Sequence, residues 1–279
     1  LNISYNFKNH SIKASYNRLN QYLHLISNTS SPTPLDIWVP SGPYIKPQKL
    51  DQFALGYYTK LKGIKFESEV FYKKIKNRLD YIDGADLVAN DNIETVILPG
   101  ISRAYGMELL LRKNLGRHKY WIAYTLSKSE QKTTGRNSNE NGINMSKWYN
   151  TPYDKTHDFS INTEYNLNKK LKIVGNFIFQ TGQPTNYPNS QYNYMNLNVP
   201  NYGERNSNRL PNYHRLDVNL TLTPNKKDKK VESSWVFGVY NLYNRDNASS
   251  IIFRRNNETL KNEAVQISIF GIVPSVTYN

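Results

Sequence analysis

Residues 1–7 read Leu-Asn-Ile-Ser-Tyr-Asn-Phe and alternate strictly between apolar and polar side chains. Successive side chains of a β-strand point to opposite faces of a sheet, so a period of two indicates a strand with one apolar and one polar face. After a short polar turn at 8–10, Ile12, Ala14 and Tyr16 continue the alternation. The two runs predict a β-hairpin.

The same pattern recurs along the chain and predicts about eleven strands, each long enough to cross a bilayer at a tilt. Further strands are expected near residues 53–61, 65–72, 105–111, 120–126, 159–165, 171–179, 216–222 and 235–239. A final strand is expected over residues 265–278, with Pro274 producing a bulge near its end.

The expected connections alternate between short and long. Long loops are rare in compact soluble domains, whereas membrane β-barrels have short turns at one rim and long loops at the other. Short turns are expected at 8–10, 62–63, 114–117, 166–170 and, rich in lysine, 224–230; long loops are expected at about 21–48, 83–99, 128–153, 181–212 and 245–263.

The two faces of the expected strands differ in chemistry. Aromatic residues on the apolar face lie near strand ends, where the interfacial girdles of a barrel belong; they are Tyr5, Phe7, Tyr16, Tyr57, Tyr72, Tyr105, Tyr120, Tyr165, Phe179 and Tyr278. The opposite face carries charges that a wet lumen accepts and a sandwich core does not; they are Lys13, Lys65, Glu67, Glu69, Glu108, Arg112, Lys172, Arg215 and Asp217. The sequence therefore predicts an all-β, transmembrane antiparallel β-barrel, against the alternative of a soluble antiparallel sheet.

Composition excludes several other classes. The 279 residues contain no Cys, which removes disulfide scaffolds, thiolate metal sites and cysteine catalysis. No apolar run reaches the roughly 18 residues of a membrane helix. The formal charge is +14, but Lys and Arg are spread over short polar segments instead of forming one stripe. Nucleic acid is therefore not an expected partner.

Six short stretches occur in an order and spacing that carry a family resemblance. They are Phe-Tyr-Lys (71–73), Ala-Tyr-Gly-Met-Glu-Leu (104–109), Thr-Gly-Gln-Pro (181–184), Tyr-His-Arg-Leu-Asp (213–217), Tyr-Asn-Leu-Tyr-Asn-Arg (240–245) and Phe-Gly-Ile-Val-Pro-Ser-Val-Thr-Tyr (270–278). With them, the chain resembles the C-terminal half of the barrel of a TonB-dependent outer-membrane receptor of the type common in Bacteroidetes.

That resemblance implies a plugged barrel of about 22 strands in the bacterial outer membrane, of which residues 1–279 are the C-terminal portion. It also implies a plug, a TonB-contacting segment and often a carboxypeptidase-regulatory-like domain, all encoded before residue 1. The implied partners are a TonB-type energy transducer, outer-membrane lipid and lipopolysaccharide, and a surface lipoprotein.

The implied function is active import of a scarce small ligand, such as a siderophore, an oligosaccharide or a peptide, with no bond made or broken. Aromatic loop residues are the candidate ligand contacts, because flat rings stack on sugars and chelates. They are Trp38, Tyr44, Trp148, Tyr149, Tyr153, Tyr187, Tyr192 and Tyr194. A passive outer-membrane pore or structural barrel and a soluble carbohydrate-binding β-sheet protein are the alternative functions.

No catalytic residue, cofactor or metal site is expected. His24, His157 and His214 lack metal-binding spacing, and His214 is expected to make a structural hydrogen bond to backbone. Asp83, Asp86 and Asp91 miss the spacing of an EF-hand loop and read as a solvated loop. Glu67 and Glu69 share one face as a glycosidase pair would, but lumen lining beside Lys65 and Arg112 is the favoured interpretation.

Overall fold

The computed structural model describes residues 1–26, 37–87, 90–195, 197–224, 233–256, 258 and 262–279. Most of the lysine-rich turn expected at 224–230 and part of the loops expected at 21–48, 83–99, 181–212 and 245–263 lie outside these residues.

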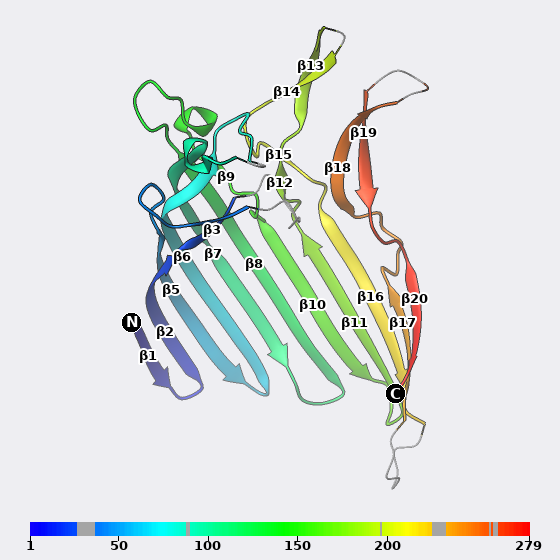
Figure 1. Cartoon of the computed structure of the whole chain (residues 1–279). Coiled ribbons are helices and arrows are strands. Elements are labelled where there is room, and N and C mark those ends of the chain that lie inside the picture. Colours follow the sequence, from blue (N-terminus) through cyan, green and yellow to red (C-terminus); the bar gives the residue numbers. More distant parts are fainter. Residues whose placement is uncertain (27–36, 88–89, 196, 225–232, 257, 259–261) are drawn as a thin grey trace.

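One antiparallel sheet forms the body of the molecule (Figure 1). Each strand pairs with the next one that belongs to the sheet, and the short β9 (Tyr149–Asn150) pairs with β8 at one end. The eleven strands of the main path confirm the expected number. They are β1 (Asn2–Phe7), β2 (His10–Gln21), β5 (Gln48–Leu61), β6 (Ile64–Tyr81), β7 (Ile97–Lys113), β8 (His118–Thr133), β10 (His157–Asn166), β11 (Leu171–Gln180), β16 (Tyr213–Leu222), β17 (Trp235–Tyr240) and β20 (Val273–Tyr278).

The connections separate into two rims, as the sequence predicts. Figure 1 shows the hairpin turns below the sheet, at the short-turn rim, and the long connections above it, at the long-loop rim. At the short-turn rim, Lys62 and Gly63 both have positive φ, 48° and 79°, which is the backbone of a two-residue hairpin turn matched to the strand twist.

The long connections carry secondary structure of their own, which the sequence pattern does not predict. Within the described residues they contain hairpins β3 (Leu23–Ile26) with β4 (Ile37–Pro40), β13 (Pro188–Tyr194) with β14 (Leu197–Tyr202), and β18 (Ala248–Arg255) with β19 (Asn262–Ser268), the pair β12 (Pro184–Thr185) with β15 (Asn208–Arg209), and the short helices η1 (Ile93–Thr95) and η2 (Ile143–Ser146). In the described part of the chain, no helix is long and apolar enough to cross a membrane.

Strand β8 also continues to Thr133, beyond the expected end near residue 126, because its upper residues still pair with β7.

The single final strand expected over residues 265–278 is wrong. Residues 262–268 form β19 and pair with β18, whereas β20 begins at Val273 and pairs with β17. Asn244, with φ of 52°, accepts a hydrogen bond from the Ile272 backbone N–H at 2.7 Å and so fixes the chain between the two strands. Pro274 pairs opposite Val239 without a register shift, so the expected bulge is absent from this pair.

Register gives the sheet one apolar and one charged face. Residues directly opposite each other in antiparallel strands share a face. One such row is Ile3, Ala14, Leu55, Val70, Met107 and Leu126; the neighbouring row, on the other face, is Lys13, Gly56, Glu69, Glu108, Thr125 and Asp158. Leu55 is 52% exposed and Val70 47% exposed, so the apolar face is bare in the chain alone and suits lipid.

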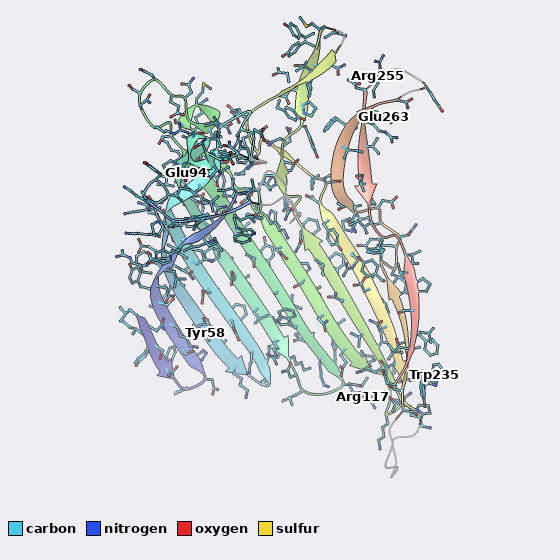
Figure 2. The ribbon with its side chains drawn as sticks, viewed as in Figure 1. Tyr58, Glu94, Arg117, Trp235, Arg255 and Glu263 are labelled. Carbon is cyan, nitrogen blue, oxygen red and sulfur yellow. The ribbon has the colours of Figure 1, made fainter. Side chains whose placement is uncertain are left out.

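The charged face confirms the polar surface expected from the alternation. The Tyr58 hydroxyl donates to Glu69 at 2.8 Å, and the Lys13 ammonium lies 4.5 Å from the centre of the same ring. Figure 2 marks Tyr58 low on the sheet. Glu67 and Glu69 project from one face of β6, opposite Leu110 and Glu108 of β7.

Aromatic side chains form belts across the apolar face. Near the long-loop rim Tyr16 packs on Phe53 with ring centres 4.8 Å apart, and Tyr72 lies beside Tyr105 at 6.5 Å. Near the short-turn rim the ring contacts are Tyr5–Phe7, His118–Tyr165 and Trp235–Tyr278. Two belts on the lipid-facing surface are the arrangement expected of a membrane barrel.

The buried apolar clusters lie at the long-loop rim, where β6 and β7 extend above the upper belt. Ile97 and Leu98 are consecutive in β7 and therefore face opposite sides. In the described residues, Ile97 packs with Ile26, Val39, Ile45 and Leu87, whereas Leu98 packs with Ile143 and Tyr149. Loops thus cover both sides of the same strand extension.

The face assignment predicts opposite outcomes for two neighbouring leucines of β7. Leu109 lies on the apolar face opposite Ser68 and Tyr124, and Leu110 lies on the charged face opposite Glu67. In the intact protein, Leu109→Arg is expected to make folding into lipid vesicles less favourable by about 2–4 kcal/mol, because the charge meets the bilayer midplane. Leu110→Arg is the matched control and is expected to cost far less. Urea titration followed by tryptophan fluorescence measures both, and equal losses would contradict the assignment.

Candidate functional site

A β-bulge aims Asp80 into the long-loop rim. The pairing of β6 with β7 shifts between Lys76 and Arg78, and the extra residue, Asn77, has φ of 58°. Such a bulge changes which alternate residues face each side. Arg78 and Asp80 consequently lie on the same face as Glu69, although their positions in the sequence have the opposite parity.

Four side chains, here called the rim network, meet around this carboxylate: Asp80, Gln131, Tyr149 and Arg205. Asp80 accepts hydrogen bonds from the Gln131 amide at 2.7 Å and from the Tyr149 hydroxyl. Its other oxygen accepts from the Arg205 guanidinium at 2.6 Å. The side chains of Asp80 and Arg205 are each only 8% exposed, so this ion pair is nearly dry.

Arg205 joins three further groups. It also pairs with the exposed Asp83 carboxylate and donates to the Tyr81 carbonyl at 2.8 Å. Its guanidinium lies 4.3 Å from the centre of the Tyr81 ring. Asn144, in η2, exchanges two hydrogen bonds with the Arg205 backbone, at 2.8 and 3.0 Å. The connection between β11 and β16 is thereby fastened to those that follow β6 and β8.

A second fastening involves the Thr-Gly-Gln-Pro stretch at 181–184. Arg209 pairs with the buried Asp154 carboxylate and donates to the Gly182 carbonyl at 2.9 Å. Gly182 lies so close to the Leu210 carbonyl that a Cβ would clash with it. Glycine is therefore required where this stretch leaves β11.

Two more of the stretches with family resemblance contact each other. Arg215 pairs with Asp217 at 2.9 Å and donates to the Tyr240 hydroxyl at 2.7 Å. Asn241, fully buried and with φ of 53°, donates its backbone N–H to Asp217 and exchanges hydrogen bonds with the Arg245 backbone. Residues 213–217 and 240–245 therefore build the connection that follows β17.

Burial shifts two ionisable groups at this rim. Burial, with the neighbouring negative charge of Asp80, raises the pKa of Tyr149. Burial lowers the pKa of His24, and the positive charge of Arg78 adds to the effect. The His24 ring is held by Ser41 and Gln48, each at 2.9 Å. The hydroxyl and the neutral ring serve as hydrogen-bonding partners in the fold.

The eight candidate contacts lie on different surfaces. Tyr149 is 6% exposed and its hydroxyl belongs to the rim network. Trp148 covers the Arg103 guanidinium at 4.1 Å, and Arg103 shares the apolar face of β7 with Tyr105. Tyr187 packs edge-on against Phe253. The rings that remain largely exposed belong to Trp38, Tyr44, Tyr153, Tyr192 and Tyr194.

A groove lies between the two outer hairpins, β13–β14 and β18–β19. It encloses about 430 Å³ and brings Tyr202, Phe253, Arg254 and Arg255 together with polar side chains of both hairpins. The Asn262 amide donates to Gln191 across it. Figure 2 places Arg255 and Glu263 in the upper part of the β18–β19 hairpin. The groove could not be predicted from the sequence, because its lining residues come from two distant segments, 188–202 and 253–262, that share no motif.

His214, His157 and Asp83 have structural partners. The His214 ring contacts the Tyr243 hydroxyl at 2.7 Å, so its partner is a side chain and not the expected backbone group. His157 contacts the Tyr124 hydroxyl at 2.9 Å. Asp83 belongs to the Arg205 contact described above. Among the described residues, no three His, Asp or Glu side chains gather as metal ligands would.

The rim network predicts that the Tyr149 hydroxyl is structural. Tyr149→Phe leaves Asp80, Gln131 and Thr133 each short of a buried partner and is expected to cost about 1–3 kcal/mol. Hydrogen exchange over residues 134–156 of the intact protein should rise accordingly. Tyr153→Phe, which changes an exposed tyrosine of the same loop, is the matched control and should leave exchange unchanged. Unaltered protection in the Tyr149 variant would refute the structural role.

Several solved structures share this fold. Over 99% of this chain and 34% of the other, the structure matches the ferric-catecholate import receptor Fiu of E. coli K12, with a TM-score of 0.60 and 16% identity. The ferripyoverdine receptor of Pseudomonas aeruginosa matches over 99% of this chain and 31% of its own, with a TM-score of 0.62 and 12% identity. The ferric preacinetobactin receptor BauA of Acinetobacter baumannii matches over 98% of this chain and 34% of its own, with a TM-score of 0.54 and 17% identity.

The chain thus spans about a third of the length of these receptors. No curated protein matches the sequence. The model of the TonB dependent receptor-like β-barrel family matches residues 1–242, which is most of the chain. The chain therefore belongs to the family of TonB-dependent receptor-like β-barrels of the outer membrane.

Proposed function

We propose that the intact protein is an active importer, which binds a scarce small ligand at the long-loop rim and carries it inward with energy from a TonB-type transducer. The observation that supports this best is the structured long-loop rim. Buried ion pairs and two apolar clusters hold its connections in place, whereas the opposite rim has short hairpins. Ordered loops present a defined surface to a ligand, which a simple pore does not need. Family and neighbours are receptors and transporters, and we propose no enzymatic step.

The groove between the outer hairpins is the ligand surface that we propose, together with the exposed rings of Trp38, Tyr44, Tyr153, Tyr192 and Tyr194. Tyr202 and Phe253 offer flat faces for stacking, and Arg255 is an exposed cation beside them. A ligand with flat rings or sugar faces and an anionic group would satisfy both. In this proposal the ligand does not contact Trp148, Tyr149 or Tyr187; these side chains pack within the long-loop rim and hold its shape.

We propose further that residues 1–279 are the C-terminal portion of a larger barrel of the Bacteroidetes type. The chain's coverage of about a third of the matched receptors supports a larger barrel. The remaining strands, the plug, the transducer-contacting segment and a carboxypeptidase-regulatory-like domain would then be supplied by sequence outside these residues. A surface lipoprotein would be an accessory partner at the long-loop rim.

Uptake by whole cells tests the import proposal. Cells that produce the intact protein are given radiolabelled ferric chelates, fluorescent oligosaccharides and labelled peptides, with and without a functional transducer. Active import predicts saturable uptake of at least one probe class that stops when the transducer is removed. Uptake that rises in proportion to concentration and persists without the transducer would instead identify a passive pore.

The groove is tested with an arginine pair. Arg255→Gln is expected to reduce uptake of the identified probe by about tenfold or more, as loss of a charge-assisted contact would. Arg117→Gln removes the same charge from an exposed arginine at the short-turn rim, which Figure 2 shows at the other end of the sheet, and should leave uptake unchanged. Equal uptake by both variants would move the ligand site away from the groove.

A further inference from the structure

Three residue rows cross strands β2, β5, β6, β7 and β8 on the lipid-facing side, near the long-loop rim. The lowest is the aromatic belt described above, with Tyr16, Phe53, Tyr72 and Tyr105 in register and Lys128 at its end. Two residues farther along each strand is a middle row, and two residues beyond that an upper row. Each step moves about 7 Å toward the long-loop rim.

The middle row consists mainly of ion pairs. Its members, in register, are Arg18, Asp51, Lys74, Arg103 and Glu130. Arg18 pairs with Asp51 at 2.7 Å, and Arg103 pairs with Glu130 at 2.8 Å. Lys74 stands between the two pairs and forms no ion pair within the described residues.

The upper row contains three lysines and no carboxylate. Its members, in register, are Asn20, Lys49, Lys76, Ile101 and Lys132. Lys49 and Lys76 are directly opposite each other, which is unfavourable for like charges unless an anion lies between them. In the described part of the chain, none of the three lysines has a carboxylate within ion-pair distance.

A cavity opens among these lysines. It encloses about 540 Å³ and is lined by Lys74, Lys76, Ile101 and Lys132 together with Asn77, Pro99, Gly100 and Thr134. Lys74 and Lys76 are exposed at its edge, and Lys132 is half-buried. We call the lysines Lys49, Lys74, Lys76 and Lys132 the lysine shelf.

We propose that the lysine shelf binds the phosphate group of a phosphorylated glycolipid in the outer leaflet of the membrane. Aromatic belts mark the headgroup level of a bilayer, so a shelf about 7–14 Å farther along the strands than the belt meets the headgroups and not the acyl chains. Lysine ammonium groups donate to phosphate oxygens, and the cavity can admit the headgroup. The acyl chains then lie against the apolar rows that include Leu55, Val70 and Met107 below.

The side of the sheet separates this site from the rim network, and none of its lysines lines the groove between β13–β14 and β18–β19. Lys74 and Lys76 precede the bulge at Asn77, whereas Asp80, beyond it, lies on the opposite face. The lipid proposal therefore depends on the membrane face of β5–β8 and not on import of any ligand. Its failure and that of the proposed function would be independent results.

Native mass spectrometry of the intact, detergent-extracted protein tests the proposal. The probes are the phosphorylated glycolipid in mixed micelles and the same lipid after enzymatic dephosphorylation. The triple variant Lys74→Gln, Lys76→Gln, Lys132→Gln should retain about tenfold less phosphorylated lipid than the natural sequence, or lose it entirely. Lys60→Gln, Lys169→Gln, Lys170→Gln removes three charges close to the short-turn rim and is the matched control, which should retain the lipid.

A second variant adds a repulsive charge. Ile101→Glu places a carboxylate in the middle of the upper row and should also expel the lipid, and heat-modifiable gel migration confirms that each barrel is folded. The proposal would be overturned if the folded shelf variants retained as much lipid as the natural sequence, or if the control lost as much lipid as the shelf variants. Binding of the dephosphorylated lipid as tight as that of the phosphorylated lipid would also overturn it. Displacement of all bound lipid by inorganic phosphate, with the free ion bound equally well, would reduce the shelf to an adventitious ion site and overturn it too.

Discussion

The whole structure depends on unbroken antiparallel pairing in register. A bilayer offers no hydrogen bonds to the backbone, so each membrane strand must bond to its neighbours, and each residue then has a fixed face. Leu55 and Val70 meet lipid because they stand opposite each other, and Gly56 and Glu69 meet water for the same reason. A slip of one residue between β5 and β6 would exchange the two surfaces, and the alternating sequence therefore specifies one register.

This constraint also decides where the chain builds a conventional core. Within the described residues, the buried apolar clusters occur where β6 and β7 rise above the upper aromatic belt. There no lipid covers the strands, so loop residues such as Ile45 and Ile143 cover them instead. Asn77 provides the accompanying change of face, because its bulge turns Asp80 toward Arg205 and the connection that this arginine fastens.

The sheet could be predicted from the sequence because its signal is local and repeated: period two, turn residues and aromatic positions recur in every hairpin. The loops could not, because their order comes from contacts between distant segments. Tyr149 and Tyr153 look alike in sequence, yet Tyr149 is buried by Asp80, 69 residues away, and Tyr153 is exposed. Arg205 carries no motif either, and its role follows from Asp80. The split of residues 265–278 into two strands likewise depends on Asn244.

The same strands serve two environments on their two faces, and this explains the uneven distribution of positive charge. On the face with Asp80, the buried Arg205 is matched by the buried Asp80 carboxylate, since an unpaired charge there would be costly. On the membrane face, Lys49 and Lys76 have no carboxylate within ion-pair distance in the described residues, although Arg18 and Arg103 one row below are paired. Lysines that repel one another at headgroup level are unfavourable in the isolated sheet. They become favourable once the negative charge of an anionic lipid lies between them. The membrane is thus part of the charge balance of this barrel as well as the solvent of its apolar face.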